Sequence, residues 1–538
     1  MGFDLLLLYN LFVTFAPVLF TGYNPKASLA CKNWMQLLKK WLFSDVFRRQ
    51  SWVMVMIMKS TEDFVRSMRS LIPHEAEAFF SALEEDAPVS IRLNPTKFRR
   101  NPLCFSPEMV AQTVPWSQWG YYLSERPSFT FDPLFHAGYY YVQEASSMFL
   151  EYVVRQLVHE PAMCLDLCAA PGGKSAILLS SLPEGSLVVS NEIVRQRACV
   201  LSENLIKLGQ SNAAVCNNAP ADFAAFPRFF DLVLVDAPCS GEGMFRKSEN
   251  AVAEWSLKNV EMCASRQRNI LTDVWDALKP GGLLIYSTCT YNVYENEENV
   301  RWIADELGAE CVSFPVDESW GISPALLSGV EAYRFFPHKV KGEGLFVAVL
   351  RKSASTKRGT INNSFRQKNK NRGISFLNDI AEYVSLLQNP DDFCFVENRG
   401  RITALPRTHV EILLTLAQKL RVMSLGIDIG NKKGCDFIPT HALAMSTQLN
   451  PDAFCRQEVS YEQAIAYLRG ETIALDRLPL GFVLIAYKNE PLGFVKNLGN
   501  RTNNLYPREW RIRSSHLPEK REEPFGMVIE DSTKNPIP

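Results

Sequence analysis

The chain has 538 residues, of which 47% are hydrophobic, and its formal net charge is −1. This is long enough for about three domains with real cores, and the near-zero charge excludes a uniformly basic nucleic-acid coat, so any basic surface must be local. The thirteen cysteines are an odd number without a CxxC pair, which argues against a zinc site and a disulfide framework and suits a reducing cytoplasm.

The first 57 residues differ from the rest of the chain. Leu5 to Phe20 is apolar but is interrupted by an asparagine and a proline. It is short for a membrane span and lacks the basic start of a signal peptide. From Met58 the sequence is typical of an ordinary cytoplasmic start. We therefore expect residues 1–57 to be a non-native or mis-assigned extension, with a membrane anchor as the alternative.

Residues 58–150 predict an α+β module. Val89 to Leu93 alternates apolar and polar side chains, which predicts a half-buried strand. Aromatic side chains crowd Pro115 to Tyr141. Most of them are expected to be plain core, while a minority can stack on unpaired nucleic-acid bases.

The middle of the chain, residues 151–352, alternates strands and helices. Short apolar, β-branched runs are predicted to be buried parallel strands. These runs are Ala162 to Leu167, Leu187 to Ser190, Ala213 to Cys216, Phe230 to Val235 and Gly282 to Tyr286. The alternation predicts a doubly wound, mostly parallel α/β sheet, with ligands beyond the carboxyl ends of its strands.

A glycine-containing turn follows the first of these strands and opens a helix. Glycines let a ligand approach the backbone, and the start of a helix offers free N–H groups. Because the two glycines are adjacent, neither the Walker nor the dinucleotide fingerprint fits. The candidate binding residues are Cys168, Ala169, Ala170, Pro171, Gly172, Gly173 and Lys174. Glu192, at the tip of the second strand, suits a ribose diol; the alternative is a charge at the start of the next helix.

Two cysteines follow two of the predicted strands. Cys239 lies in a turn just after Asp236, and Cys289 lies just after the strand that ends at Tyr286. Since both strands end at the same edge of the sheet, the two cysteines are predicted to converge over one cleft. A thiolate is a strong nucleophile, so the pair indicates covalent catalysis. The alternative is two small buried hydrophobic side chains.

The C-terminal third begins with a basic run. Residues 353–375 are expected to be a solvated linker that can also touch phosphates. A small helical region is expected over residues 376–433. From residue 434 to 515 a helix and a β-hairpin predict a small β-rich module, whose interleaved arginines, tyrosine and tryptophan indicate nucleic-acid binding, or else a solvated edge. The tail, residues 516–538, is polar and expected to be loose.

Three motifs carry a resemblance to a known family. CAAPGGK, DAPCSGEG and STCTYN resemble the Nol/Nop/Sun family of RNA cytosine-5 methyltransferases, and within it the RsmF type. SIRLNP, at Ser90 to Pro95, is similar to the family's N-terminal module, and Arg334 to Lys352 is similar to its closing strand region. The C-terminal module resembles a PUA-like RNA-binding domain. The resemblance covers residues 59–515.

The resemblance implies a class I, Rossmann-like fold and S-adenosylmethionine as the cofactor. The turn from Cys168 to Lys174 would hold its amino-acid end, and Glu192 would hold its ribose. Asn218 stands where the family commonly has an aspartate near the adenine. Asp236 would lie beside the methyl donor and the target base.

The implied reaction methylates carbon 5 of a cytosine in small-subunit ribosomal RNA. We assign Cys289 as the nucleophile and Cys239 to the later elimination, with Asp236 hydrogen-bonding or protonating the base at nitrogen 3. The target base must be unpaired or flipped out. Three alternatives stay open: transfer RNA as substrate, a DNA methyltransferase with Cys239 in its Pro-Cys motif as nucleophile, and a non-catalytic RNA-binding ribosome-assembly factor. The chain is expected to be a cytoplasmic monomer that binds no metal and no membrane.

Overall fold

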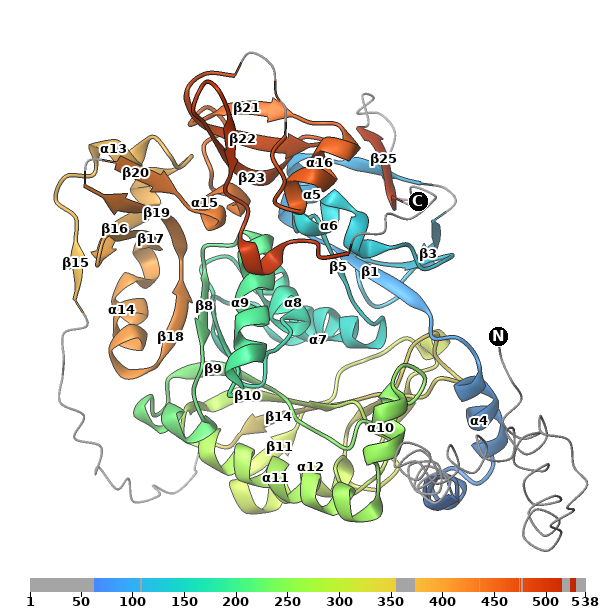
Figure 1. Ribbon diagram of the computed structural model, residues 1–538. Helices are drawn as coiled ribbons and strands as arrows, with labels where there is room; N and C mark the ends of the chain where they lie inside the picture. Colours follow the sequence, from blue (N-terminus) through green and yellow to red (C-terminus); the bar gives the residue numbers. More distant parts are fainter. Residues whose placement is uncertain are drawn as a thin grey trace, which may run out of the picture. The chain divides into compact units, whose positions relative to one another are not determined.

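The computed structural model describes most of the chain, and Figure 1 labels its elements. The described residues are 62–106, 109–354, 373–434, 436–473, 475, 478–514 and 523–528. The expected extension 1–57, most of the basic linker and the end of the tail lie outside them. The chain divides into two units, Met1–Val65 and Arg66–Pro538, and the labelled elements belong to the second.

A mixed sheet forms the centre of the second unit. Its five parallel strands are β6 (Met163–Asp166), β7 (Leu187–Asn191), β8 (Ala213–Cys216), β9 (Phe230–Asp236) and β10 (Leu278–Thr288). They lie in the order β10-β9-β6-β7-β8. The chain order reverses between β6 and β9, which is where ligands bind in such sheets. Next to β10 the sheet continues with antiparallel strands, first β14 (Leu345–Lys352) and then β13 (Tyr333–Phe335) and β12 (Ser323–Pro324).

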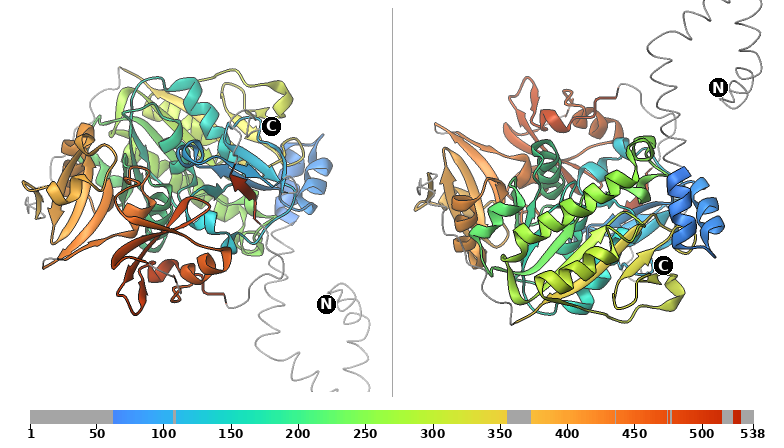
Figure 2. Two further views of the ribbon diagram at one scale, coloured as in Figure 1. Left: turned by 90° about the horizontal axis from the view of Figure 1, so that it is seen from above. Right: turned by 90° about the horizontal axis from the view of Figure 1, so that it is seen from below.

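Helices cover both faces of this sheet. On one face α7 (Phe149–Leu157), α8 (Gly173–Ser181) and α9 (Arg195–Leu208) share a core with Val188. On the other face α11 (Leu257–Trp275) and α12 (Glu297–Leu307) share a core with Val189, the residue that follows Val188 in β7. Figure 2, seen from below, shows these two helices lying across the sheet. Successive strand residues thus face opposite cores, and the predicted doubly wound sheet is confirmed.

The N-terminal module contains a four-stranded antiparallel sheet, in the order β3-β4-β1-β5. Its strands are β1 (Val89–Leu93), β3 (Val110–Thr113), β4 (Gly120–Leu123) and β5 (Tyr140–Val142). The strand predicted at β1 is confirmed, but it is not half-buried, since Ser90 and Arg92 on its polar side are buried as well. The buried side chain of Arg92 pairs with Glu151 of α7 at 3.2 Å and so links the module to the helices of the central sheet. Many of its aromatic side chains, Tyr121 and Tyr139 among them, are fully buried core.

The prediction of a small helical region over residues 376–433 is wrong. These residues belong instead to a five-stranded antiparallel sheet with a single longer helix, α14 (Val410–Lys419). The strands are β15 (Ile374–Phe376), β16 (Phe393–Asn398), β17 (Arg401–Pro406), β19 (Ile427–Lys433) and β20 (Asp436–Pro439). Arg399 and Gly400 have positive φ and close the β16–β17 hairpin. The boundary expected at residue 434 falls inside the β19–β20 hairpin, where Lys433 pairs with Asp436.

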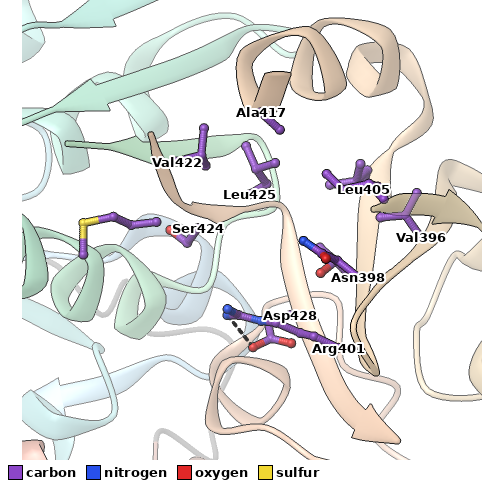
Figure 3. Close-up of a pocket in the computed structure, with 12 residues that line it drawn as sticks. Val396, Asn398, Arg401, Leu405, Ala417, Val422, Ser424, Leu425 and Asp428 are labelled. Carbon is purple, nitrogen blue, oxygen red and sulfur yellow. Dashed lines mark ion pairs between the residues drawn. The ribbon is translucent and has the colours of Figure 1, made fainter. Parts of the chain in front are cut away.

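One strand of this region leaves its own sheet. β18 (Val422–Leu425) pairs antiparallel with β8 and extends the central sheet at its edge. Behind it lies a cavity of about 160 Å³. Figure 3 shows Val422 and Leu425 facing Leu405 and Val396 of the five-stranded sheet across this cavity. The region is therefore joined to the central sheet by backbone hydrogen bonds as well as by packing.

The C-terminal module contains a four-stranded sheet and the helix α16 (Tyr461–Leu468). The strands are β21 (Cys455–Glu458), β22 (Gly481–Tyr487), β23 (Glu490–Asn497) and β24 (Thr502–Asn504). Ser460 and Gln463 form a capping box at the start of α16. The module shares a core with the N-terminal module, and buried Glu490 binds Arg100 at 2.9 Å.

Part of the tail is ordered, contrary to expectation. β25 (Phe525–Val528) pairs with β2 (Leu103–Phe105) of the N-terminal module. Phe525 is buried and packs against the rings of Phe105, Tyr139 and Tyr140. A single aromatic residue in a polar tail gives little sequence signal, but its burial in an aromatic pocket is favourable enough to hold the strand.

Candidate active site

The two cysteines lie together beyond the carboxyl ends of β9 and β10. The Cys239 sulfur is 3.1 Å from the Cys289 sulfur. β9 ends at Asp236 and β10 ends at Thr288, so two neighbouring parallel strands deliver both thiols to one edge of the sheet. Both cysteine residues are half-buried. This arrangement differs from the alternative interpretation, in which the two cysteines are small hydrophobic side chains buried in the core.

A buried carboxylate holds the two cysteine loops in register. Glu295 accepts hydrogen bonds from the backbone N–H of Ser240, at 3.0 Å, and from the side-chain amide of Gln267, at 2.8 Å. Its other oxygen accepts from the Ser240 hydroxyl and from Asn292. Ser240 adjoins Cys239 and Asn292 follows Cys289 by three residues. Glu295 therefore ties one cysteine loop to the other.

Glu242 makes a second connection between the same loops. Its carboxylate accepts from the backbone N–H groups of Tyr291, at 2.6 Å, and Asn292, at 3.0 Å, and from the indole of Trp255. Sequence reasoning missed Glu242 and Glu295 as site residues. The only local signal was two acidic residues in or just after motifs already singled out for their cysteines.

The pKa of the Cys239 thiol is raised well above its usual value. The hydrogen bond with Cys289 is the main cause, and burial and the nearby charges of Cys289 and Glu295 add to it. Cys239 therefore keeps its proton and can donate it toward the Cys289 sulfur. A thiol that keeps its proton can act as a hydrogen-bond donor to the neighbouring sulfur.

Asp236 lies between two partners at the end of β9. The Lys174 ammonium is 2.8 Å from one carboxylate oxygen, and the Ser287 hydroxyl donates to the other at 2.7 Å. Burial alone would lower the pKa of Lys174, but the Asp236 carboxylate outweighs it and the pKa is raised. About a third of the Asp236 side chain, 33%, stays exposed. The glycine turn and the end of β9 are thus joined by a charged hydrogen bond.

The turn from Cys168 to Lys174 leads into α8. Gly172 is the N-cap with φ of 115°, a conformation that favours glycine, and it supplies no side chain to cap the N–H groups of α8. Beneath the turn, Asp166 has one buried oxygen without a hydrogen-bond partner among the described residues. Burial raises the pKa of Asp166 to about 7. Open N–H groups and an unpaired acceptor fit the carboxylate and ammonium of an amino-acid group.

Glu192 follows β7 and is almost fully buried. Its carboxylate accepts from the Val194 backbone N–H at 2.8 Å and lies 3.4 Å from the Arg197 guanidinium. The first contact is the helix-start role that the sequence left open as the alternative. Asn217 donates to the backbone carbonyls of Glu192 and Ile193, at 2.8 and 2.9 Å, and fixes this loop beside the end of β8.

Asn218 does not present a free amide to the cleft. Its Oδ1 accepts from the Arg421 backbone N–H at 2.9 Å, and its Nδ2 donates to the Arg421 carbonyl at 3.1 Å. The cofactor-binding role expected of Asn218 therefore meets a competing partner 203 residues away. Arg421 was not singled out from the sequence, because nothing local connects it to Asn218.

The strand order and the glycine turn define the class I methyltransferase fold. Three family models match the chain: "16S rRNA methyltransferase RsmB/F" over residues 156–351, the "N-terminal domain of 16S rRNA methyltransferase RsmF" over 61–145, and the "Methyltransferase RsmF PUA domain" over 456–512. Within the described residues, no helix is both long and apolar enough to cross a membrane.

Relatives match over most of the chain. The ribosomal RNA small subunit methyltransferase F of Salmonella agona (strain SL483) is 32% identical over 469 residues, which is 83% of this chain and 95% of the relative. That of Escherichia coli O9:H4 (strain HS) is 29% identical over 465 residues, with the same coverage. A methyltransferase homolog of known structure from Pyrococcus horikoshii is 25% identical, covering 56% of this chain and 98% of its own, with a TM-score of 0.46. The chain belongs to the RsmF-type methyltransferases of the Nol/Nop/Sun family.

Proposed function

We propose that the protein transfers a methyl group from S-adenosylmethionine to carbon 5 of a cytosine in small-subunit ribosomal RNA. The reaction passes through a covalent bond between Cys289 and carbon 6 of the base. The observation that carries this proposal is the pair of thiols 3.1 Å apart at the ends of two neighbouring parallel strands. The family and the PUA domain support RNA as the substrate.

Carbon 5 of cytosine is a poor nucleophile until the ring is activated. The Cys289 thiolate adds to carbon 6, and the electron pair of the ring double bond moves toward nitrogen 3. We assign Asp236 the hydrogen bond to, or protonation of, that nitrogen. The bound cofactor supplies an electrophilic methyl group. Because a stacked, paired cytosine cannot reach both groups, the base must be unpaired or flipped out.

Elimination then uses the second cysteine. Once Cys289 is bonded to carbon 6 its sulfur is uncharged and a weaker hydrogen-bond acceptor, so the main cause that raises the pKa of Cys239 is reduced. Cys239 can then lose its proton to solvent and take the proton from carbon 5. The electron pair of the broken C–H bond restores the ring double bond, and the bond from carbon 6 to sulfur breaks. The cycle ends with a proton on Cys239 and a thiolate on Cys289, and one proton is released overall.

The residues assigned to the cofactor are those of the glycine turn and its surroundings. The N–H groups at the start of α8 would bind the carboxylate of its amino-acid part, and Asp166 would bind the ammonium. Glu192 would accept hydrogen bonds from the ribose hydroxyls, in addition to the one from Val194. Lys174 would hold Asp236 beside the reacting groups. We expect the protein to work as a monomer in the cytoplasm, where its RNA substrate is.

Methyl transfer to small-subunit ribosomal RNA tests this proposal. The full chain should transfer labelled methyl groups from S-adenosylmethionine to that RNA, and bisulfite sequencing should locate one protected cytosine. Cys289→Ala is the matched inactive control. Labelling of transfer RNA or of duplex DNA in place of ribosomal RNA would support those alternatives. No heat on calorimetric titration with S-adenosylmethionine would support a non-catalytic RNA-binding factor.

A further inference from the structure

A segment outside all three matched family regions reaches the cofactor end of the central sheet. β18 pairs with β8 from Ala214 to Cys216, and the backbone contact continues where the Asn217 N–H donates to the Arg421 carbonyl at 2.9 Å. α14, just before it, buries leucine side chains in the core of the central sheet. Residues 410–425 are thus built into the methyltransferase sheet, although the family match ends at residue 351 and resumes at 456.

The Asn218 side chain fastens this segment with both ends of its amide. The oxygen accepts from the Arg421 N–H and the nitrogen donates to the Arg421 carbonyl, as a neighbouring strand would. An aspartate could make the first bond but has no hydrogen to donate in the second. Asn218 itself is held by the bond from its backbone N–H to Asn191 Oδ1, at 3.0 Å. Asparagine at this position, where the family usually has aspartate, can therefore make both hydrogen bonds to the Arg421 backbone.

Asn217, Asn218 and the segment line an open cavity of about 370 Å³. It is lined by Ile193, Asn217, Asn218, Ala219, Asp222, Lys419 and Arg421. Ile193 follows the ribose candidate Glu192 and is 60% exposed, a large apolar side chain open to this cavity. An apolar platform beside a few convergent polar groups suits the flat face of a nucleobase.

We propose that residues 410–425 form one wall of the pocket for the nucleoside half of the cofactor, and that Asn218 is the positioning residue that fixes this wall. The proposal rests on the proposed function. Adenine would lie against Ile193, between the loop at Glu192 and the wall at Arg421. Asn218 would then affect cofactor affinity through Arg421 and not through a bond to adenine. The wall is supported from behind, where Ala417, Val422 and Leu425 face the five-stranded sheet (Figure 3).

Calorimetric titration of the full chain tests the proposal with two ligands, S-adenosylmethionine and 5′-methylthioadenosine, which lacks the amino-acid part. Asn218→Asp should weaken both by the same factor, about three- to tenfold, because one hydrogen bond is removed and two acceptors are brought together. The loss should appear in the KM for S-adenosylmethionine and not in the KM for RNA. Asn212→Asp is the matched control, since Asn212 makes a similar amide bond to the Ser186 carbonyl at the opposite end of β8.

A second pair of variants isolates the backbone contact. Arg421→Pro removes the N–H that Asn218 accepts from, whereas Arg421→Ala keeps it. The proline variant should bind both ligands as weakly as Asn218→Asp, and the alanine variant, which loses only the side chain, should bind both more tightly than the proline variant. This pair decides the question if Asn218→Asp does not fold, as judged by its melting temperature without ligand.

The outcomes separate this proposal from the proposed function. If the wild type binds both ligands, and Asn218→Asp and Arg421→Pro bind them with the same affinity as the wild type, the proposed wall is wrong and the proposed function still stands. Weakened S-adenosylmethionine binding with unchanged 5′-methylthioadenosine binding would also overturn it, since the nucleoside half would not be involved. A wild-type chain that binds neither ligand would overturn the function and this inference together.

Discussion

At the scale of single residues, the site depends on carboxyl groups with different surroundings. Glu295 is fully buried but surrounded by hydrogen-bond donors, Asp236 is paired with Lys174, and Asp166 keeps an unpaired buried oxygen among the described residues. The first environment suits a residue that joins two loops, the second a residue that contacts the base, and the third a residue that binds a cation. Single substitutions can separate these roles.

Glu295→Ala should destabilise the fold and impair catalysis together. The change removes the acceptor of the buried Ser240 N–H and one of the two acceptors of the Gln267 amide, which costs about 2–4 kcal/mol in the free energy of unfolding. Urea denaturation followed by circular dichroism measures it. Glu306→Ala, at an exposed position of α12, is the control and should change stability by less than about 0.5 kcal/mol. Equal stability of the two variants would contradict the connecting role of Glu295.

Asp166 predicts a pH dependence of cofactor binding. Burial raises its pKa to about 7, and only the ionised form can pair with an ammonium group. Below that pKa binding must first remove a proton, so affinity is full above about pH 8 and falls about tenfold by pH 6. Titration calorimetry across this range should show little of this dependence in Asp166→Asn. An identical pH profile in that variant would remove Asp166 from the cofactor site.

Glu192→Ala should weaken the cofactor far more than the RNA. A charged hydrogen bond to a hydroxyl pair contributes about 1.5–3 kcal/mol, which is a ten- to hundredfold change in the cofactor Kd. Glu192→Gln separates the two roles, since its amide oxygen can still accept from the Val194 N–H. If both variants bind S-adenosylmethionine as tightly as wild type, Glu192 serves only the start of α9.

At the scale of elements, local signals predicted the central sheet well. Strands such as β8 and β9 are continuous apolar runs bounded by turn residues, and their positions in the structure agree within one residue with those expected. The candidate catalytic motifs could also be recognised from the sequence, because Cys239 and Cys289 each lie within a few residues of a strand end. Parallel topology then brings two distant motifs together.

The elements that were missed depend on contacts between distant parts of the chain. β16 and β17 are short and of mixed polarity, and they form strands because each has a partner strand. The strongest local signal in this region was the leucine-rich stretch of α14, which favoured the helical prediction. β18 is a strand because β8 lies beside it. The same applies to the site, where the bonds from Asn218 to Arg421 span 203 residues. Pairing at that distance is a tertiary property and leaves no local periodicity.

At the scale of the whole molecule, the C-terminal module is structurally tied to the rest of the chain. It shares a core with the N-terminal module, and the region before it supplies β18 to the central sheet. A truncation after residue 375 would therefore remove part of the methyltransferase sheet along with the PUA domain. Surface substitutions are the cleaner way to test what this domain adds to RNA binding.

Replacing the exposed arginines Arg501, Arg508 and Arg513 with alanine should weaken RNA binding without affecting the cofactor. For every phosphate that an arginine no longer neutralises, the slope of log K against log salt should fall by about 0.7–0.9. Filter binding at several salt concentrations measures the slope, and calorimetry with S-adenosylmethionine is the control. An unchanged slope would mean that this edge is merely solvated.

The division of labour between the two cysteines is the central claim, and a denaturing gel of RNA–protein adducts tests it most directly. Cys289→Ala should form no adduct. Cys239→Ala should attack and methylate but stall, because the proton on carbon 5 has no base to accept it. Its crosslink to ribosomal RNA should accumulate only with S-adenosylmethionine and vanish in the double variant. An adduct that forms in Cys289→Ala and is absent from Cys239→Ala would contradict the account and assign the nucleophile to Cys239.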